Sequence, residues 1–453
     1  MTTDPVAPSR QRAFPVVQAT LDNGLPVVVS QDRAAPIVAV SVWYRVGSAD
    51  EEPHRTGLAH LFEHLMFEGS AQVAAGEHFQ QIHQAGGFNN ATTSFDRTKY
   101  YQCVPVEYLD LVLWLEADRM GGLLEALTQE SLDKQRGIVK NERRQRYETT
   151  PYGDSWERLY RGLYPDGHPY HHLPIGSMKD LDAASLTDVH AFFERHYAPN
   201  NAVVAIAGDV DPDAAIERAA HWFGGIPPND ELPPPPRASA VSPTPVGPPE
   251  VVEGAVPEDA IFAGFALPPS TDACMPPLEV GFNVLSSGRG SAFHRHVIRP
   301  ELAGQSAASL ERGQVGSLGG FVVLGKDGGS ADAGWQAMTD EVARLATDGP
   351  TTDEVERAQA QWRRGWLERV ADAHSRADEL AACASLYGDP QHTFVRYEEQ
   401  MRVTPGAVRD AFAAALHGRE PTVVRYLPEN SGASVGADAN ADADAAAAPG
   451  TGR

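Results

Sequence analysis

The chain has 453 residues, of which 42% are hydrophobic and 22% are charged, and its formal net charge at pH 7 is −24. This length predicts two or three domains, and this composition can form substantial hydrophobic cores. The negative charge argues against a nucleic-acid-binding protein and against docking on anionic lipid. No apolar run approaches the length of a membrane span, and residues 1–15 show no secretory signal. We therefore expect a cytoplasmic protein with no nucleic-acid or membrane partner.

Two segments divide the chain by composition. Prolines cluster from Ile226 to Pro249, and proline interrupts helices and central strands. We interpret residues 226–249 as a linker between an N-terminal domain, 1–225, and a C-terminal domain, 250–428. Residues 429–453 are rich in Ala, Asp and Gly, so we expect a disordered tail. The three widely spaced cysteines predict free thiols rather than disulfides.

The periodicity of apolar residues predicts strands and helices in a similar order in both halves. In the first half we predict strands at 16–21, 26–30, 37–46, 89–95, 98–104 and 201–207, and helices at 56–67, 78–84, 107–119, 129–148, 186–193 and 213–222. In the second half we predict strands at 250–252, 260–266, 305–311, 319–324 and 422–427, and helices at 278–286, 292–298, 333–346, 352–386 and 405–416. The matching order indicates an internal duplication of an α+β unit.

The predicted helix 56–67 contains the pattern H-x-x-E-H, formed by His60, Glu63 and His64. On a helix the two histidines lie one turn apart on one face, so their imidazoles can converge on one ion, and imidazole suits Zn²⁺. Glu63 lies beside that face, within reach of a metal-bound water. The pattern reverses H-E-x-x-H and is the inverzincin signature. The alternative is a helix with two ordinary histidines and a surface glutamate.

A catalytic zinc site also needs a third protein ligand on a neighbouring element. Residues 131–148 of the predicted helix 129–148 offer Glu142 and Glu148, and spacing alone does not choose between them. A cluster of histidines at 168, 171 and 172 lies in a Pro- and Gly-rich stretch, which we interpret as a polar loop rather than a second metal site.

These residues resemble the pitrilysin and mitochondrial-processing-peptidase family of zinc endopeptidases. In that family H-x-x-E-H is followed, somewhat under 80 residues later, by a ligand Glu, and Glu142 lies at this spacing. The segments 87–98, 151–153, 168–170 and 192–210 also match the family. The resemblance is dense over residues 16–228 and looser over 251–428. It implies two similar α/β sandwich units in tandem, each an antiparallel-rich sheet packed with helices.

The resemblance implies one Zn²⁺ per chain, held by His60, His64 and Glu142, with Glu63 as general base for a zinc-bound water. The chain would then be a zinc metalloendopeptidase acting on peptides or unfolded polypeptide segments. Many relatives carry a Glu seven positions before the metal-binding Glu, where this chain has Gln135. Because Gln can still orient the ligands by hydrogen bonding, we expect an altered rate rather than an empty site.

The resemblance also implies an edge strand that binds substrate through main-chain hydrogen bonds. Such pairing reads extended conformation more than sequence, so the substrate preference would be broad. The alternative is an ordinary strand within the sheet. The residues of this strand are Asn90, Ala91, Thr92 and Thr93.

In the family, an Arg of the C-terminal half and a Tyr seven residues later position the substrate. This chain has Arg299 as a substrate-binding candidate, but Ser306 stands in the place of the Tyr, and the second half has no H-x-x-E-H. Long relatives enclose a chamber with four such units, and this chain has about two. We therefore predict a heterodimer with a zinc-less family subunit that supplies the complete Arg/Tyr pair, with a homodimer as the second possibility.

Two other functions are compatible with the sequence. Non-catalytic core subunits of respiratory complexes resemble this family, although those generally lack an intact zinc motif. A subunit of a peptidase-like hetero-oligomer that binds zinc but cleaves slowly or not at all is the other, because Gln135 and Ser306 depart from the family pattern.

Overall fold

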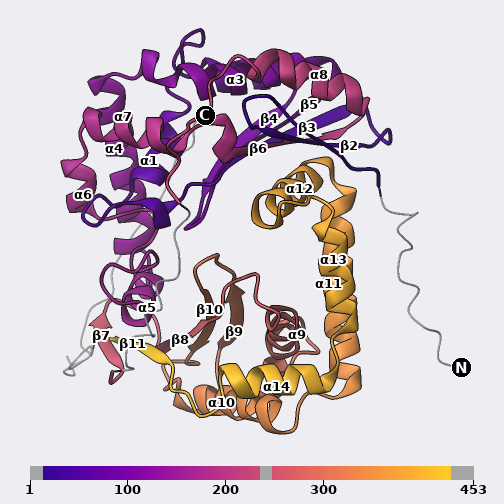
Figure 1. Ribbon diagram of the computed structural model, residues 1–453. Helices are drawn as coiled ribbons and strands as arrows, with labels where there is room; N and C mark the ends of the chain where they lie inside the picture. Colours follow the sequence, from indigo (N-terminus) through magenta and orange to yellow (C-terminus); the bar gives the residue numbers. More distant parts are fainter. Residues whose placement is uncertain (1–13, 235–246, 430–453) are drawn as a thin grey trace, which may run out of the picture.

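The computed structural model describes residues 14–234 and 247–429. Its strands form two sheets, one in each half of the chain, with helices around them (Figure 1). The first sheet has six strands in the order β1-β2-β6-β3-β5-β4, and the second has five in the order β7-β11-β8-β10-β9. The predicted fold class, two similar mixed α/β units in tandem, is thus confirmed.

The element bounds follow the chain. The strands of the first sheet are β1 (Val17–Thr20), β2 (Pro26–Gln31), β3 (Ile37–Tyr44), β4 (Phe88–Thr93), β5 (Thr98–Pro105) and β6 (Ala202–Gly208). Its helices are α1 (Leu58–Leu65), α2 (Glu77–Gln84), α3 (Leu109–Ala126), α4 (Gln129–Arg143), α5 (Ser155–Leu163), α6 (Met178–Ala183), α7 (Leu186–His196) and α8 (Pro212–Phe223).

The second half has fewer strands and longer helices. Its strands are β7 (Glu250–Gly254), β8 (Ala260–Leu267), β9 (Gln305–Glu311), β10 (Ser317–Leu324) and β11 (Thr422–Pro428). Its helices are α9 (Met275–Ser286), α10 (Asp332–Thr347), α11 (Thr352–Ala371), α12 (Ala373–Tyr387), α13 (His392–Arg402) and α14 (Pro405–Ala415).

The two sheets repeat one topology. Without the extra edge strand β1, each sheet begins with a parallel pair, β2 with β6 in the first sheet and β7 with β11 in the second. Every other neighbouring pair is antiparallel, so β3, β5 and β4 correspond to β8, β10 and β9. By this correspondence α9 takes the place of α1, and α12 takes the place of α5. The repeat explains why the chain predicts the same order of elements twice.

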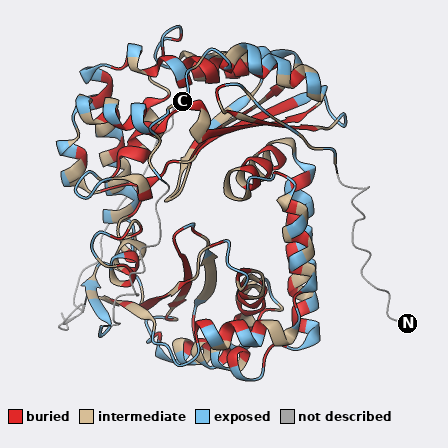
Figure 2. Cartoon of the chain, viewed as in Figure 1, coloured by how far each residue is buried: buried red, intermediate tan, exposed pale blue. Residues whose placement is uncertain are grey.

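The first sheet is buried on both faces because apolar residues occupy both sides of its central strands. In β3, Val38, Val40 and Val42 belong to the main core under α3 and α7, whereas Ala39 and Trp43 face the opposite side. Successive side chains of a strand point to opposite faces, so one strand serves two cores. Buried residues accordingly fill these strands (Figure 2).

A helix of the second half covers the opposite face of the first sheet. Helix α12 lies across β3 and β6 (Figure 1). Its alanines allow close approach to the alanines of these strands. The indole nitrogen of Trp43 donates to Asp378 at 2.8 Å, and Lys99 pairs with the same carboxylate at 2.5 Å. The contact residues of α12 are Ala377, Leu380, Ala381 and Ala384.

The reverse exchange occurs at the second sheet. Helix α5 of the first half packs on β8 and β11, and its buried Leu159 belongs to one hydrophobic cluster with Phe262 and Tyr426. The hydroxyl of Tyr426 donates to Asp154 at 2.5 Å, just before α5 begins. Each half therefore supplies one covering helix to the sheet of the other half.

Several element predictions differ from the structure. The predicted helix 352–386 is wrong, because it breaks at Asp372 into α11 and α12. Asp372 has extended backbone, and its side chain accepts a hydrogen bond from the Ser375 amide, which caps α12. Helices α5, α6 and α13 were not predicted, and helix 292–298 is a single π turn.

The proposed division into domains at 225 and 250 stays a prediction, and much of the linker, residues 235–246, lies outside the described residues. The predicted tail lies outside them from residue 430. In the described ranges, every helix is too short or too polar to cross a membrane.

The exchange of helices predicts that α12 stabilises the first sheet. We expect Leu380→Ala to lower the free energy of unfolding by about 2–5 kcal/mol, because Leu380 is fully buried against the sheet. The control is Leu367→Ala on α11, where the leucine is 51% exposed and we expect a change within about 0.5 kcal/mol. Urea unfolding measures both. Equal effects of the two substitutions would show that α12 contributes nothing to this core.

Candidate metal centre

Helix α1 presents two chemically distinct faces. Leu58, Leu61, Phe62 and Leu65 are buried in the main core, which fixes the rotation of the helix. His60, Glu63 and His64 therefore lie on the other face, where all three are partly buried. The helix starts at Gly57, whose φ is 94° and whose Cβ position would lie 3.0 Å from the carbonyl oxygen of Ile175. A side chain at position 57 would both strain the backbone and clash.

Helix α4 packs beside α1 and brings Glu142 to the two histidines. Its Oε2 lies 3.7 Å from Nε2 of His60 and 3.5 Å from Nε2 of His64. Possible ligand atoms of the three side chains all lie within 4.8 Å of one another, and no other group of this kind occurs in the described parts of the chain. Glu148, the other candidate ligand from the predicted helix 129–148, does not belong to this group. Directly after Glu142 and Arg143 the helix widens into a π turn, Arg144–Glu148.

The chemistry of this donor set fits Zn²⁺. Two imidazole nitrogens and one carboxylate oxygen form a common catalytic zinc site, and ligands at about 2.1 Å in a tetrahedron lie about 3.4 Å apart. The observed separations of 3.5 and 3.7 Å are close to that value. Burial lowers the pKa of His60 to about 4, so its imidazole is neutral and its lone pair is available at neutral pH. The neighbouring His64 lowers the pKa of Glu142, which keeps the carboxylate charged.

Glu63 stands beside this group without belonging to it. Burial raises the pKa of its carboxyl group, and the Thr93 hydroxyl, which donates to Glu63 Oε2 at 2.7 Å, opposes that rise. Thr93 is the last residue of β4, so the hydrogen bond joins α1 to this strand. The structure thus places Glu63 between the possible metal ligands and β4.

Strand β4 lies at the edge of the first sheet and pairs there with β5 alone among the described strands. Asn90 is exposed, and its side-chain oxygen accepts a hydrogen bond from the Ala91 amide. Ala91 is buried, and Thr92 accepts a hydrogen bond from Arg97 at its hydroxyl oxygen and at its carbonyl oxygen. Because β5 is the one described strand that pairs with it, β4 has the free edge that pairing with a peptide requires.

No described hydrogen bond joins Gln135 to His60 or His64, although Gln135 lines a pocket beside His64. It is buried on α4, and its amide donates to Glu68, which also forms an ion pair with Lys134 at 2.7 Å. Glu68 and Gln135 line a pocket together with Glu63, His64 and Phe67. The carboxylate at this contact is that of Glu68, across from Gln135. A glutamine fits this contact because its amide donates to Glu68, whereas a glutamate at position 135 would place a second carboxylate against the first.

The structure does not join Arg299 to this centre. Arg299 is exposed after the π turn His294–Ile298, and no described hydrogen bond or ion pair links its side chain to the histidines or to β4. Ser306 lies on β9, opposite Val323 of β10, and its hydroxyl is buried without a described partner. No tyrosine from the second half replaces it in the described contacts of the centre.

Sequence patterns missed the residues that support α1. The carboxylate of Glu51 accepts hydrogen bonds from the amides of Gly57 and Ala59, and Asp180 accepts from the amide and hydroxyl of Thr56. Asp180 lies 124 positions from Thr56, and Glu51, although near the motif, acts on backbone amides, so local spacing reveals neither contact. His172 belongs to the loop that we predict to be polar. Its Nε2 lies 2.8 Å from Glu51 Oε2, so this histidine has a structural partner outside the loop.

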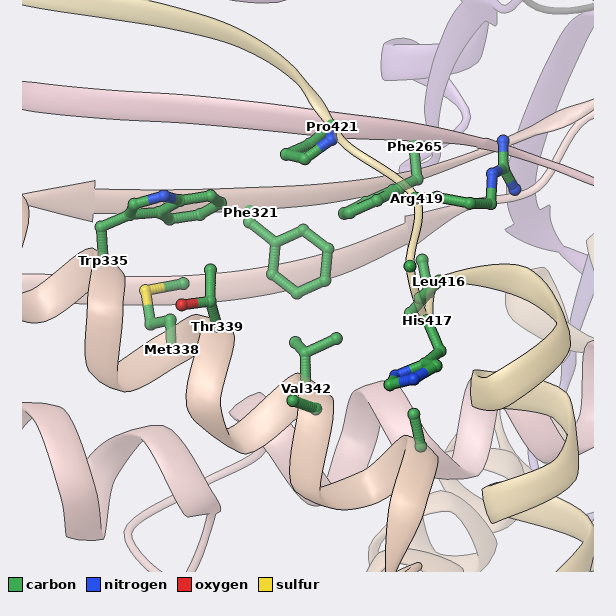
Figure 3. Close-up of a pocket in the computed structure, with 13 residues that line it drawn as sticks. Phe265, Phe321, Trp335, Met338, Thr339, Val342, Leu416, His417, Arg419 and Pro421 are labelled. Atoms are coloured by element: carbon green, nitrogen blue, oxygen red, sulfur yellow. The ribbon is translucent and has the colours of Figure 1, made fainter. Parts of the chain in front are cut away.

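A second, apolar pocket lies in the other half (Figure 3). It is enclosed by α10, by the second sheet and by residues 416–421. Trp335, Met338 and Val342 of α10 face Phe265 and Phe321 of the sheet. None of the predicted site residues lines it, so the candidate chemistry belongs to the first half.

Comparison with known proteins relates both halves to one group of peptidases. The family model "Insulinase (Peptidase family M16)" matches residues 27–160, and the model "Peptidase M16 inactive domain" matches residues 183–362. The zinc protease PqqE of Helicobacter pylori is 37% identical over 213 residues, which are 47% of each chain. The aligned segment thus spans about half the length of that relative. An uncharacterized zinc protease of Streptomyces coelicolor is 25% identical over 413 residues, 90% of this chain and 88% of that one.

Solved structures agree with this relation. A protease from Helicobacter pylori superposes with a TM-score of 0.85 at 26% identity, over 92% of this chain and 100% of that one. A peptidase M16 inactive domain from Pseudomonas fluorescens superposes with a TM-score of 0.82 at 18% identity, over 92% and 98% of the two chains, and shows the shared fold.

The contact between Glu68 and Gln135 predicts that a glutamate at position 135 destabilises the protein. We expect Gln135→Glu to lower the free energy of unfolding at pH 8 by about 1–3 kcal/mol, because it buries two carboxylates in contact. The loss should shrink at pH 5, where the new glutamate takes up a proton more readily. Glu68→Gln in the same chain should remove most of the loss. Urea unfolding of the four chains of this double-mutant cycle measures it, and a zero coupling would contradict the prediction.

Proposed function

Because the chain belongs to the insulinase family of peptidases, M16, we propose that it is a zinc-dependent endopeptidase that hydrolyses peptides or unfolded polypeptide segments. The observation that carries this proposal is the convergence of His60, His64 and Glu142, with Glu63 beside them and a free strand edge within one hydrogen bond of Glu63. The names of the similar proteins, zinc proteases, support it.

In this proposal His60, His64 and Glu142 would hold one Zn²⁺. Bound zinc acts as a Lewis acid that polarises the scissile carbonyl and makes water more acidic. Arg146 pairs with Oε1 of Glu142 at 2.8 Å, which orients the carboxylate. Gln135, through its contact with Glu68, fixes the neighbouring surface of α4 rather than a ligand.

Glu63 serves as the general base. Its carboxylate takes the proton of the attacking water at one oxygen and returns it to the amine of the leaving peptide. Burial favours this task because it raises the pKa of Glu63 from its ordinary value towards neutrality. The Thr93 hydroxyl holds the carboxylate in place while leaving the second oxygen free.

The substrate binds in extended form along β4. The outer edge of the strand offers main-chain donors and acceptors, and the peptide adds a strand to the first sheet. Asn90, Ala91, Thr92 and Thr93 provide this edge, and the Asn90 side chain must leave the Ala91 amide for that amide to bind the peptide. The pocket beside Glu63 and His64 then takes the side chain next to the scissile bond, against Phe67 and Phe79.

We expect Glu63→Gln to abolish turnover and keep the metal. Loss of the general base should lower kcat by about 100- to 10,000-fold on a quenched, unstructured peptide, whereas zinc content should stay near one per chain. The matched control is Glu130→Gln, an exposed glutamate in the first turn of α4, with wild-type turnover expected.

Outcomes of this experiment separate the two functions. Cleavage by the native chain and none by Glu63→Gln establishes the proposed mechanism. Equal cleavage by both would overturn the role of Glu63. Zinc binding without cleavage by the native chain would favour the alternative, a zinc-binding subunit with weak or no activity in a peptidase-like hetero-oligomer.

The second half supports a proposal about the partner. Arg299 is present and exposed, but Ser306 replaces the tyrosine of the family pair, so we propose that a zinc-less family subunit supplies the complete pair in a heterodimer. The isolated chain should then cleave slowly, and a family subunit with the Arg/Tyr pair should raise kcat by at least about 10-fold. Light scattering measures whether the two subunits associate, and turnover of the peptide measures the rise in kcat. A homodimer of the pure chain with full activity would contradict the proposal.

A further inference from the structure

The start of α1 lacks the usual side-chain cap. Gly57 occupies the N-cap position and has no side chain to accept the amide hydrogens of the first turn. Unpaired amides at a helix start are costly when buried, and this helix start is buried. Another group must therefore accept them.

Glu51 supplies the acceptor from outside the helix. Its Oε2 accepts from the Gly57 amide at 2.9 Å, and its Oε1 accepts from the Ala59 amide at 2.8 Å. The side chain of Glu51 is completely buried, and Nε2 of His172 lies 2.8 Å from Oε2. Ala59 directly precedes His60, so the second of these hydrogen bonds is made one residue before the first possible zinc ligand.

Thr56, which directly precedes Gly57, fixes the start of α1 through a second set of hydrogen bonds. The Thr56 hydroxyl donates to Asp180 at 2.6 Å and accepts from the Ser177 amide at 3.0 Å. Glu51 and the Thr56 contacts thus fix the axial position of α1. Because His60 and His64 are rigidly spaced along one helix, that position sets the distance of both histidines from Glu142 on α4.

Charge gives Glu51 a role that Thr56 does not have. A helix start carries roughly half a positive charge, which opposes a divalent cation bound one turn further on. A carboxylate against the two amides offsets that charge. Burial raises the pKa of Glu51, and the hydrogen bonds from His172 and the two amides oppose the rise.

We propose that Glu51 is a positioning residue for the metal centre, which holds the first turn of α1 and favours binding of the cation at His60 and His64. The proposal rests on the zinc site proposed above. Glu51 touches neither the ligands nor the substrate, so it acts through α1. His172 secures Glu51 in turn.

The test measures zinc affinity by competition with a chromogenic chelator, without peptide substrate. Glu51→Gln keeps the size of the side chain but has one acceptor oxygen for two amides, so we expect zinc to bind about 10- to 100-fold more weakly. Glu51→Asp keeps the charge at a shorter reach and should recover part of the affinity. His172→Gln, which leaves Glu51 intact, should weaken binding by a few-fold, and it carries the test if Glu51→Gln does not fold.

The matched control is Asp372→Asn, which alters a carboxylate that caps α12 through the Ser375 amide, in the other half. Its zinc affinity should stay within about twofold of wild type even where Tm falls. A zinc affinity of Glu51→Gln within twofold of wild type, measured on folded protein, would overturn the proposal and leave the proposed function standing. Absence of zinc binding by the wild-type chain would overturn both.

Discussion

Each sheet of this molecule has two apolar faces, and neither half of the chain covers both faces of its own sheet. The exchange of α5 and α12 solves this problem, because each helix covers the sheet of the other half. An uncovered sheet face would expose a row of valines and alanines to water, which is unfavourable in proportion to its area. The two halves are therefore interlocked parts of one structure, and the break at Asp372 is what turns α12 toward the first sheet.

This exchange also connects the half without a metal motif to the proposed substrate strand. The imidazole of His374, at the start of α12, stacks on Tyr101 of β5 with ring centroids 4.2 Å apart, and it contacts Phe88 of β4 edge-on at 5.9 Å. Lys99 of β5 pairs with Asp378 of the same helix. The second half thus supports the strands that position Thr93, and through Thr93 the carboxylate of Glu63.

Local patterns were sufficient where one helix or strand determines the answer. The spacing of His60, Glu63 and His64 was informative because an apolar face fixes the rotation of α1, and the same periodicity located most strands. Glu142 needed the family resemblance, since its approach to His64 depends on how α1 and α4 pack. Glu51 and Glu68 escaped prediction because their partners lie far along the chain or are backbone amides. The break at Asp372 had a local signal, an Asp three residues before Ser375, but a long apolar periodicity concealed it.

Four glutamates lie on α1 or beside it, and their partners distinguish their roles. Glu51 is held by two amides and His172, Glu68 by Lys134 and Gln135, and Glu142 by Arg146 beside the two histidines. Glu63 has a single described hydrogen bond, from the neutral hydroxyl of Thr93, and no described ion pair. A cationic partner would hold the carboxylate in its charged form and make it a poorer proton acceptor. Among the four, Glu63 is therefore the carboxylate that is free to accept a proton and release it again, which is the property that a general base requires.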